Sequence, residues 1–531
     1  MLLPTFFHNP TDSIDQWDFH TLLFLALWSI FPVTWYTWIF FTTKSKSNLP
    51  PGPPGLPLFG NLLSLDPELH EYFASLSQTY GPIFSLRLGT KYSVVLTSAS
   101  MARQVLKDHD VIFANHDATI AGRVVTYGGR DVVFCPYGSE WRMLRKVVVQ
   151  WMVTTTTFGS IHTLRRNQEF QKIVGYIYSR VGSPVDLGEQ MFLTVLNMNT
   201  NIIWGDTVEG DEKTVIGREF REVMTHVMEL MGKPNLSDFF PWLAWFDLQG
   251  VEKQMRLQVQ KFDRIFEKLI KQRLKKKKKK KVISGSEADD EKSKDFLEFL
   301  FKLKDEQKDS KTPLTLANIK ALLLEMMIGG TDTTSNTMEF AIAHIINEPK
   351  VMKRVQEELD CVVGKNNKVE ESHIQKLPYL LAVMKETLRL HPIFPLLVPH
   401  CPSETTVVGD YTILKGYRVF VNVWAMHRDP SIWDNPLEFD PSRFLDGQYD
   451  YKGNDFNYLP FGSGRRICAG MAYAERTFLY CVATMMHSFE WKVPQGQKLD
   501  ISEKFGVALK MKMPLVAIPT PRLSNPALYE Q

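Results

Sequence analysis

The longest apolar run of the chain lies close to its N-terminus. From Phe19 to Phe41 no side chain carries a full charge when His20 is neutral, and Leu, Phe, Trp and Ile predominate. The length suits a bilayer-spanning helix of roughly 20 residues. Aspartates precede the run and lysines follow it, so the positive-inside rule places the main body in the cytosol. The pattern predicts a membrane anchor over residues 19–41 behind a short lumenal segment, 1–18. A buried core helix is the alternative, which Pro32 favours.

Prolines dominate the stretch that follows the apolar run. The sequence from Leu49 to Gly55 holds four prolines and two glycines, and proline fixes φ and removes a hydrogen-bond donor. We expect a stiff, extended hinge over residues 42–58, with the catalytic domain comprising residues 59–531. A generic linker or a proline-rich ligand for another domain are the alternatives.

Beyond the hinge, a strand-like pattern from Ile83 to Val95 gives way to helical patterns. One long helix is predicted from Thr315, a good N-terminal cap, to Asn347, just before a proline. Its middle, Gly329 to Thr334, is a run of poor helix formers. Glycine allows a ligand to approach closely, and threonine can bond back to the preceding turn. A structural kink is the alternative explanation.

Composition adds little to this picture. The length of 531 residues alone suggests several domains, but no internal repeat divides the chain. The formal net charge of +3 does not favour nucleic-acid binding. The lysine run Lys275–Lys281 is expected to form a solvated loop between helices. Five scattered cysteines indicate a reducing compartment rather than a disulfide framework.

One cysteine stands in a distinctive setting. The segment Phe461 to Gly470 reads Phe-Gly-Ser-Gly-Arg-Arg-Ile-Cys-Ala-Gly and precedes a helix-forming run. Glycines let backbone N–H groups approach the sulfur of Cys468, and a helix N-terminus adds partial positive charge. A sulfur anion of this kind suits haem iron. For a lone cysteine, a buried core thiol is the alternative.

The pattern Phe-x-x-Gly-x-Arg-x-Cys-x-Gly resembles the haem-ligand loop of cytochrome P-450, the haem-thiolate monooxygenase family, and its wording is similar to plant microsomal members. The resemblance implies one large, mainly α-helical domain with small β-sheets, plus one N-terminal transmembrane helix. It implies haem b as the cofactor, with Cys468 as the iron ligand and Phe461 beside the haem. It also implies anchoring in the endoplasmic reticulum membrane, with the catalytic domain in the cytosol.

Further motifs follow in the family's order. The segment Gly329 to Thr334 resembles the oxygen-binding motif, with Gly329 where alanine is more usual. The resemblance implies catalytic roles for Thr333, which would hold bound oxygen and a water, and for Asp332, which would relay protons.

Buried haem propionates need cationic or donor partners. By resemblance these are Trp141, Arg145, Arg466 and His400. For Trp141 and Arg145 an ordinary amphipathic helix is the alternative, and for His400 a solvated loop histidine.

Two more motifs imply a structural contact. Glu386-x-x-Arg389 precedes His-Pro, and Pro441-Ser-Arg443-Phe resembles the segment that meets it in the family. We expect Glu386 to lie between Arg389 and Arg443 and to hold the fold behind the haem.

The implied reaction inserts one atom of dioxygen into a hydrophobic small molecule. No dinucleotide-binding glycine motif follows a strand, so the electrons of NADPH should arrive through a separate reductase, with Arg142 and Lys146 available for docking. By family analogy the substrate meets 118–134, Met326 to Ile328, 393–398 and 505–509, which are largely apolar.

A terpenoid is favoured as the substrate, for example in sesquiterpene hydroxylation, and a phenolic or flavonoid compound comes next. A haem-thiolate hydroperoxide isomerase or dehydratase would carry the same cysteine loop, and so would a non-catalytic haem sensor. Asp332 and Thr333 argue against the isomerase, which would not need them.

Overall fold

The computed structural model describes residues 28–30, 34, 48–156, 161–205, 211–284, 295–307, 311–494 and 498–530. The predicted anchor over 19–41 and the lumenal segment lie almost wholly outside these residues. Within the part of the chain that is described, no helix is long and apolar enough to cross a membrane. In the described part of the hinge, residues 48–55 form neither helix nor turn, and a turn follows at residues 57–59. The hinge lies against the first strand, where the N–H of Ser85 donates to the carbonyl of Pro51 at 2.7 Å.

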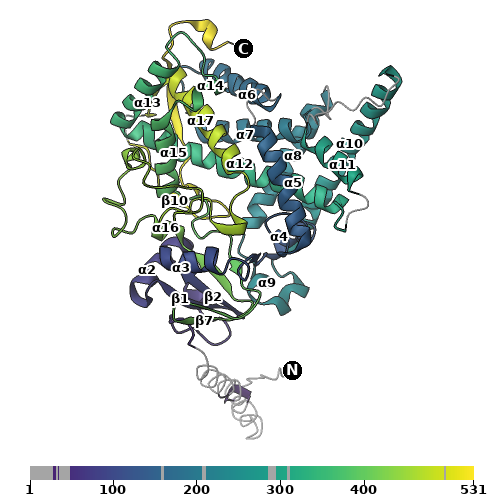
Figure 1. The fold of residues 1–531 in the computed structure, drawn as a ribbon, viewed down its shortest axis with the longest axis vertical. Coiled ribbons are helices and arrows are strands. Elements are labelled where there is room, and N and C mark those ends of the chain that lie inside the picture. The colour runs from purple at the N-terminus through teal and green to yellow at the C-terminus, as the bar shows by residue number, and fades with distance from the viewer. Residues whose placement is uncertain are drawn as a thin grey trace, which may run out of the picture.

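The larger part of the molecule is helical (Figure 1). The helices are α2 (Leu69–Tyr80), α3 (Ala99–Arg103), α4 (Ile120–Val125), α5 (Ser139–Thr156), α6 (Ile161–Tyr178), α7 (Leu187–Trp204), α8 (Asp211–Gly232), α9 (Leu236–Phe239), α10 (Val251–Ser284), α11 (Phe296–Glu306), α12 (Leu316–Asn347), α13 (Pro349–Val362), α14 (Glu371–Ile374), α15 (Pro378–Leu390), α16 (Val423–Met426) and α17 (Met471–Ser488). Helix α12 runs through the middle and packs against α7, α15 and α17. The predicted mainly helical class is confirmed.

The strands form small sheets. The largest has the order β1-β2-β8-β5-β3, with β2 and β8 parallel and the other pairs antiparallel. Its strands are β1 (Ile83–Leu88), β2 (Lys91–Leu96), β8 (Arg418–Val421), β5 (His400–Cys401) and β3 (Asn115–His116). The remaining strands are β4 (Val185–Asp186), β12 (Val516–Pro521) and β9 (Phe489–Lys492) in one sheet, β10 (Glu503–Lys504) with β11 (Lys510–Met511), and β6 (Thr406–Val408) with β7 (Tyr411–Ile413). The strand-like pattern after the hinge is therefore the β1–β2 hairpin.

Helix α12 begins and ends where the sequence predicts. The side chain of Thr315 accepts the N–H of Asn318, whose own side chain accepts the N–H of Thr315. This reciprocal pair satisfies two of the donors that a helix start leaves free. The helix remains continuous through its glycine–threonine middle, since seventeen of its side chains are buried among neighbouring elements. Tertiary packing outweighs the weak local propensity.

The lysine run departs from its prediction. Lys275 to Lys281 continue α10 instead of forming a loop. Lysine is a good helix former, and a helix already fixed by packing along its first turns extends at little cost.

Candidate functional site

A cavity of about 390 Å³ opens beside Cys468 in the centre of the molecule. Its walls come mainly from α12, α5, α7, the loop before α5, the segment that follows α15 and the glycine-rich loop before α17. The side chains that line it are largely apolar, with the polar groups gathered around the cysteine loop and along α12. Segments distant in sequence therefore meet at one apolar space with a few converging polar groups, which is the usual composition of a small-molecule site.

Cys468 lies three residues before α17, with its sulfur open to this cavity. Its backbone N–H donates to the carbonyl of Phe461 at 3.1 Å, which closes the loop. Burial raises the pKa of the Cys468 thiol, whereas the N–H of Gly470 and the guanidinium of Arg145 lower it. The loop thus holds a sulfur with an N–H donor and a cation near it, as a thiolate ligand requires.

The loop needs glycine at one position for a steric reason. Gly464 has φ +66°, and a Cβ there would lie 2.2 Å from the carbonyl oxygen of Leu106. A larger residue would push the loop away from the neighbouring segment.

Arg466 ties the cysteine loop to Ala114 and to the segment 131–135, which we call the strap. Its guanidinium donates to the carbonyls of Ala114 (2.5 Å), Val132 (2.7 Å) and Cys135 (2.7 Å), and it stacks over Trp141 with a separation of 4.7 Å. Arg466 also lines the cavity. Its placement beside Cys468 agrees with the sequence, and backbone carbonyls of the described residues use most, but not all, of its five N–H donors.

Trp141 and Arg145, on one face of α5, have different surroundings. The indole N–H of Trp141 donates to the carbonyl of Val132 at 3.0 Å, and the ring is buried outside the cavity lining. Arg145 faces the cavity, and with the described residues it makes no hydrogen bond or ion pair. Burial lowers the pKa of Arg145, while Cys468 and Glu325 counteract that shift. A buried cation without a partner is costly, so Arg145 is ready to receive an anionic group.

His400 lies on β5 and faces the same cavity. Its Nδ1 bonds to the carbonyl of Phe113 at 2.7 Å, so Nδ1 carries the proton. Burial lowers the pKa of His400 to about 4, and Arg466 opposes protonation further. Neutral His400 therefore offers only a lone pair at Nε2, and it must gain a proton before it can donate to a carboxylate. His116 is arranged in the same way, with Nδ1 bonded to the carbonyl of Val133 at 2.7 Å and Nε2 buried without a partner among the described residues.

On α12, the two residues predicted to be catalytic face different directions. Thr333 lines the cavity, and its hydroxyl donates to the carbonyl of Gly329 at 2.6 Å, which leaves lone pairs free toward the cavity. Asp332 lies outside the cavity lining. Burial raises the pKa of Asp332, and Lys510 on β11 lowers it.

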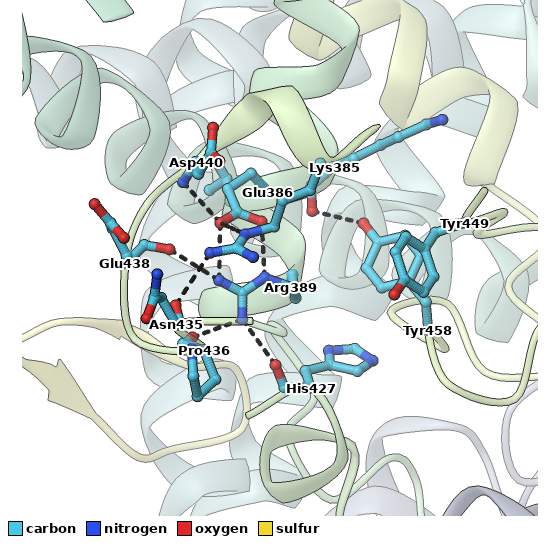
Figure 2. A network of polar contacts seen from close by, with 12 residues as sticks. Lys385, Glu386, Arg389, His427, Asn435, Pro436, Glu438, Asp440, Tyr449 and Tyr458 are labelled. Atoms are coloured by element: carbon cyan, nitrogen blue, oxygen red, sulfur yellow. Dashed lines mark hydrogen bonds and ion pairs between the residues drawn. The ribbon is translucent and has the colours of Figure 1, made fainter. Parts of the chain in front are cut away.

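Glu386 sits between two arginines, Arg389 and Arg443, as the sequence predicts. Figure 2 shows its carboxyl group against the guanidinium of Arg389. Arg389 binds it through two bonds, of 2.7 and 2.8 Å, and the Nε of Arg443 lies 3.4 Å from its Oε1. The remaining donors of Arg389 reach the carbonyls of His427, Pro436 and Glu438. These residues join α15 to the segment that leads to the cysteine loop, and they hold structure rather than face the cavity.

Glu325 and Asn199 are among the polar residues of the cavity that were not predicted from the sequence. Glu325 faces the cavity from α12, two turns before Thr333. The side chain of Asn199 on α7 donates to the hydroxyl of Thr331 on α12 at 3.0 Å and accepts from the hydroxyl of Tyr473 on α17 at 2.7 Å. It therefore links α7 to both α12 and α17. A polar residue within an apolar helical stretch was the available signal at both positions.

The predicted substrate segments contribute as expected, with one exception. The four segments each supply lining residues, among them Phe134, Met326, Phe394 and Val507. Met327 instead points into the core, where it is fully buried. Successive residues of a helix point in different directions, so three neighbours cannot all face one cavity.

The residues present fit a haem. A sulfur ligand on a loop faces an apolar space lined from several helices. Arg145, which has no partner among the described residues, stands beside it for an acidic substituent. Thiolate sulfur is a ligand suited to haem iron, and a cation suits a propionate.

Comparison with known proteins agrees with this site. The cytochrome P-450 family model matches residues 50–517. A flavonoid 3'-monooxygenase of Arabidopsis thaliana is 39% identical over 499 residues, which cover 92% of this chain and 94% of that protein. A geraniol 8-hydroxylase of Swertia mussotii is 36% identical over 511 residues, covering 95% of this chain and all of that protein.

Solved structures are similar as well. A zebra fish cytochrome P-450 in complex with progesterone superposes with a TM-score of 0.71 at 25% identity, covering 85% of this chain and 99% of that one. The sequence motifs, the site around Cys468 and both comparisons lead to one assignment. The chain belongs to the cytochrome P-450 family and is a haem-dependent monooxygenase.

Proposed function

We propose that this monooxygenase hydroxylates a hydrophobic terpenoid, with sesquiterpenes and monoterpenes as the first compounds to test. The observation that carries the proposal is the apolar cavity beside Cys468. Between α12 and the segment after α15 its wall consists mainly of aliphatic, methionine and phenylalanine side chains. Such a wall holds a flexible apolar molecule by shape with few polar anchors.

In the overall reaction, a C–H bond of the substrate and one O–O bond are broken. One oxygen atom enters the substrate as a hydroxyl group and the other leaves as water, with two electrons from NADPH and two protons. The haem supplies the oxygen-activating chemistry when it is bound to Cys468. The protein's own residues hold the substrate, exclude bulk water and deliver protons.

Proton delivery is assigned to Thr333 and Asp332. The hydroxyl of Thr333 gives its hydrogen to Gly329, so toward the cavity it can accept a hydrogen bond from a water. Asp332, adjacent on α12 and outside the cavity lining, is placed to exchange protons with the Lys510 side of the molecule. Arg145 and Arg466 are proposed to hold the haem propionates, together with Trp141 and, once protonated, His400.

The protein is further proposed to sit in the endoplasmic reticulum membrane through residues 19–41, with a cytosolic NADPH-dependent reductase as its electron donor. Arg142 and Lys146 are both exposed on α5, on the helix that carries Arg145 toward Cys468. Exposed cations at this position support electrostatic docking of an acidic partner.

Flavonoid hydroxylation is the second candidate function. The observation that favours it is the 39% identity to a flavonoid 3'-monooxygenase over nearly the full chain. A flavanone therefore belongs in the same substrate panel.

The test is product analysis with microsomes that contain the protein and a reductase. The panel comprises geraniol, sesquiterpene hydrocarbons and a flavanone, and the dioxygen is isotopically labelled. We expect a terpenoid product that carries one labelled oxygen atom, and Thr333→Val should lower its yield per NADPH by about a hundredfold, since general acid–base groups contribute at least that much. Turnover of the flavanone alone would replace the first candidate by the second, and an unchanged yield from Thr333→Val would refute the role of Thr333.

A further inference from the structure

Glu325 is a carboxyl group deep in the substrate cavity that no step above uses. It lies on α12 within an apolar stretch, and its accessible surface faces the cavity. One oxygen, Oε2, accepts the N–H of Val132 at 2.8 Å. Among the described residues, the other oxygen has no hydrogen-bond or ion-pair partner. The free oxygen is accessible from the cavity, where a ligand can complete its hydrogen bonding.

The neighbouring charged groups do not supply a partner for the free oxygen of Glu325. Asp131 uses its own Oδ1 to accept the N–H of Phe134 at 3.0 Å. Arg145 and Arg466 face the same cavity, yet neither lies within ion-pair distance of Glu325. The two arginines are assigned to the haem propionates, so the free oxygen of Glu325 points to a different ligand.

The position of Glu325 along the helix relates it to the reaction. Glu325, Gly329 and Thr333 are spaced by four residues, so they share one face of α12, and all three line the cavity. Eight residues of α-helix separate Glu325 from Thr333, which corresponds to about 12 Å along the axis. A group held at Glu325 therefore lies about two helical turns from Thr333 in the same cavity, although Glu325 is still close enough to act electrostatically on Cys468.

We propose that Glu325 binds a hydroxyl or carbonyl oxygen at one end of the substrate and so directs oxidation to the opposite end. The inference rests on the proposed function and narrows it. The preferred substrate is an oxygenated terpenoid rather than a plain hydrocarbon, and it reacts at a carbon far from its existing oxygen.

The protonation state agrees with this role. Burial raises the pKa of Glu325 to about 8, with a further rise from Asp131, whereas the N–H of Val132 and the two arginines lower it. At neutral pH the group is therefore mainly a neutral acid. One oxygen accepts from Val132, and the other carries a hydrogen that can be donated to an alcohol or carbonyl oxygen.

A purely structural role is the competing explanation, because Glu325 also holds the strap around Val132. The two roles are separable with a matched pair of ligands, geraniol and its hydrocarbon analogue without the hydroxyl. Dissociation constants are measured on the purified holoenzyme from the haem absorbance change on ligand binding. Variants are Glu325→Leu, Glu325→Gln and, as a control on the same wall, Met326→Leu.

We expect Glu325→Leu to weaken geraniol binding by about tenfold or more, as loss of a buried hydrogen bond does, and to leave the hydrocarbon nearly unaffected. Glu325→Gln retains an acceptor for Val132 and a donor for the ligand, so it should keep most of the affinity for geraniol. Met326→Leu should change the dissociation constants of both ligands by a similar factor. In turnover, the wild type should oxidise geraniol at the end remote from its hydroxyl. Glu325→Leu should give a mixture of products oxidised at several carbons.

If Glu325→Leu weakened the binding of both ligands equally, Glu325 would only support the strap. If geraniol binding were unchanged, Glu325 would have no role in substrate recognition. Either result leaves the proposed function intact. If neither ligand binds the wild type, the preference for oxygenated terpenoids is wrong. Failure of the whole substrate panel to give an oxygenated product would instead refute the proposed function.

Discussion

Two buried polar regions of this molecule are built from the same residue types and differ in how completely the protein satisfies them. Behind the cysteine loop, Glu386 receives Arg389 and Arg443, and all five N–H donors of Arg389 have acceptors (Figure 2). In the cavity, Glu325 has one partner and Arg145 has none among the described residues. Burial raises the pKa of both glutamates, so desolvation does not distinguish the two regions. The use of the arginine donors does: Arg389 has no N–H left free, although the Nε of Arg443 makes no hydrogen bond, whereas Arg145 has no partner among the described residues.

The difference separates structure from function. The pair of Glu386 and Arg389, in which every donor of the arginine is used, has no capacity for a ligand and is needed for the fold. An unsaturated group in a cavity costs stability and is explained by what it binds. Three kinds of variant would break or sharpen this contrast, beginning with the network.

The largest effect is expected from Glu386→Ala. It would leave Arg389 fully buried without its carboxylate, which costs about 3–5 kcal/mol for a buried ion pair that loses one partner. The variant should yield little folded protein, measured as haem-containing material and by thermal unfolding. The control is Glu357→Ala, which removes a largely exposed partner of Lys353 at 3.7 Å and should change stability by less than about 1 kcal/mol. A Glu386→Ala protein with near-normal stability would contradict the assignment.

Arg145→Leu should weaken haem retention without lowering the stability of the fold. The guanidinium has no protein partner to lose among the described residues, and burial already disfavours its charge, so the haem-free protein should be as stable as the wild type or slightly more stable. Haem retention should fall, because a propionate would lose its cation. The measurement is the stability of the haem-free protein next to the rate of haem transfer to apomyoglobin. A large loss of stability without haem would show that Arg145 serves the fold.

Two adjacent glycines of α12 provide the smallest and most local contrast. A Cβ at Gly329 would meet no atom within 4 Å, whereas a Cβ at Gly330 would lie 3.1 Å from the Nδ2 of Asn199. Gly329→Ala should stabilise the protein by about 0.5–1 kcal/mol and preserve activity, since it only restrains the unfolded chain. Gly330→Ala should gain less or lose stability and disturb the bond from Asn199 to Thr331. Equal effects in thermal unfolding would show that this bond does not constrain the helix.

The contrast also explains what could be predicted from sequence. Local signals were sufficient for the ends of α12 and for the placement of Cys468 before α17, because caps, glycines and prolines act on near neighbours. The contact of Glu386 with Arg443 followed from motif resemblance. The role of Glu325 could not be found in this way, since its only donor among the described residues, Val132, is 193 residues away in the chain. The lysine run became helix because its preceding turns are held by packing that the local charge pattern does not report.

The central claim is that Cys468 is the thiolate ligand of the haem. Its most direct test is the difference spectrum of the reduced protein with carbon monoxide, recorded for the wild type and for Cys468→Ala. We expect the thiolate-type band in the wild type and its complete loss in Cys468→Ala. The fold should be retained, because the sulfur faces the cavity and interacts mainly with the N–H of Gly470 and the charge of Arg145. Persistence of the thiolate-type band in Cys468→Ala, or a wild-type spectrum characteristic of an imidazole ligand, would contradict the assignment.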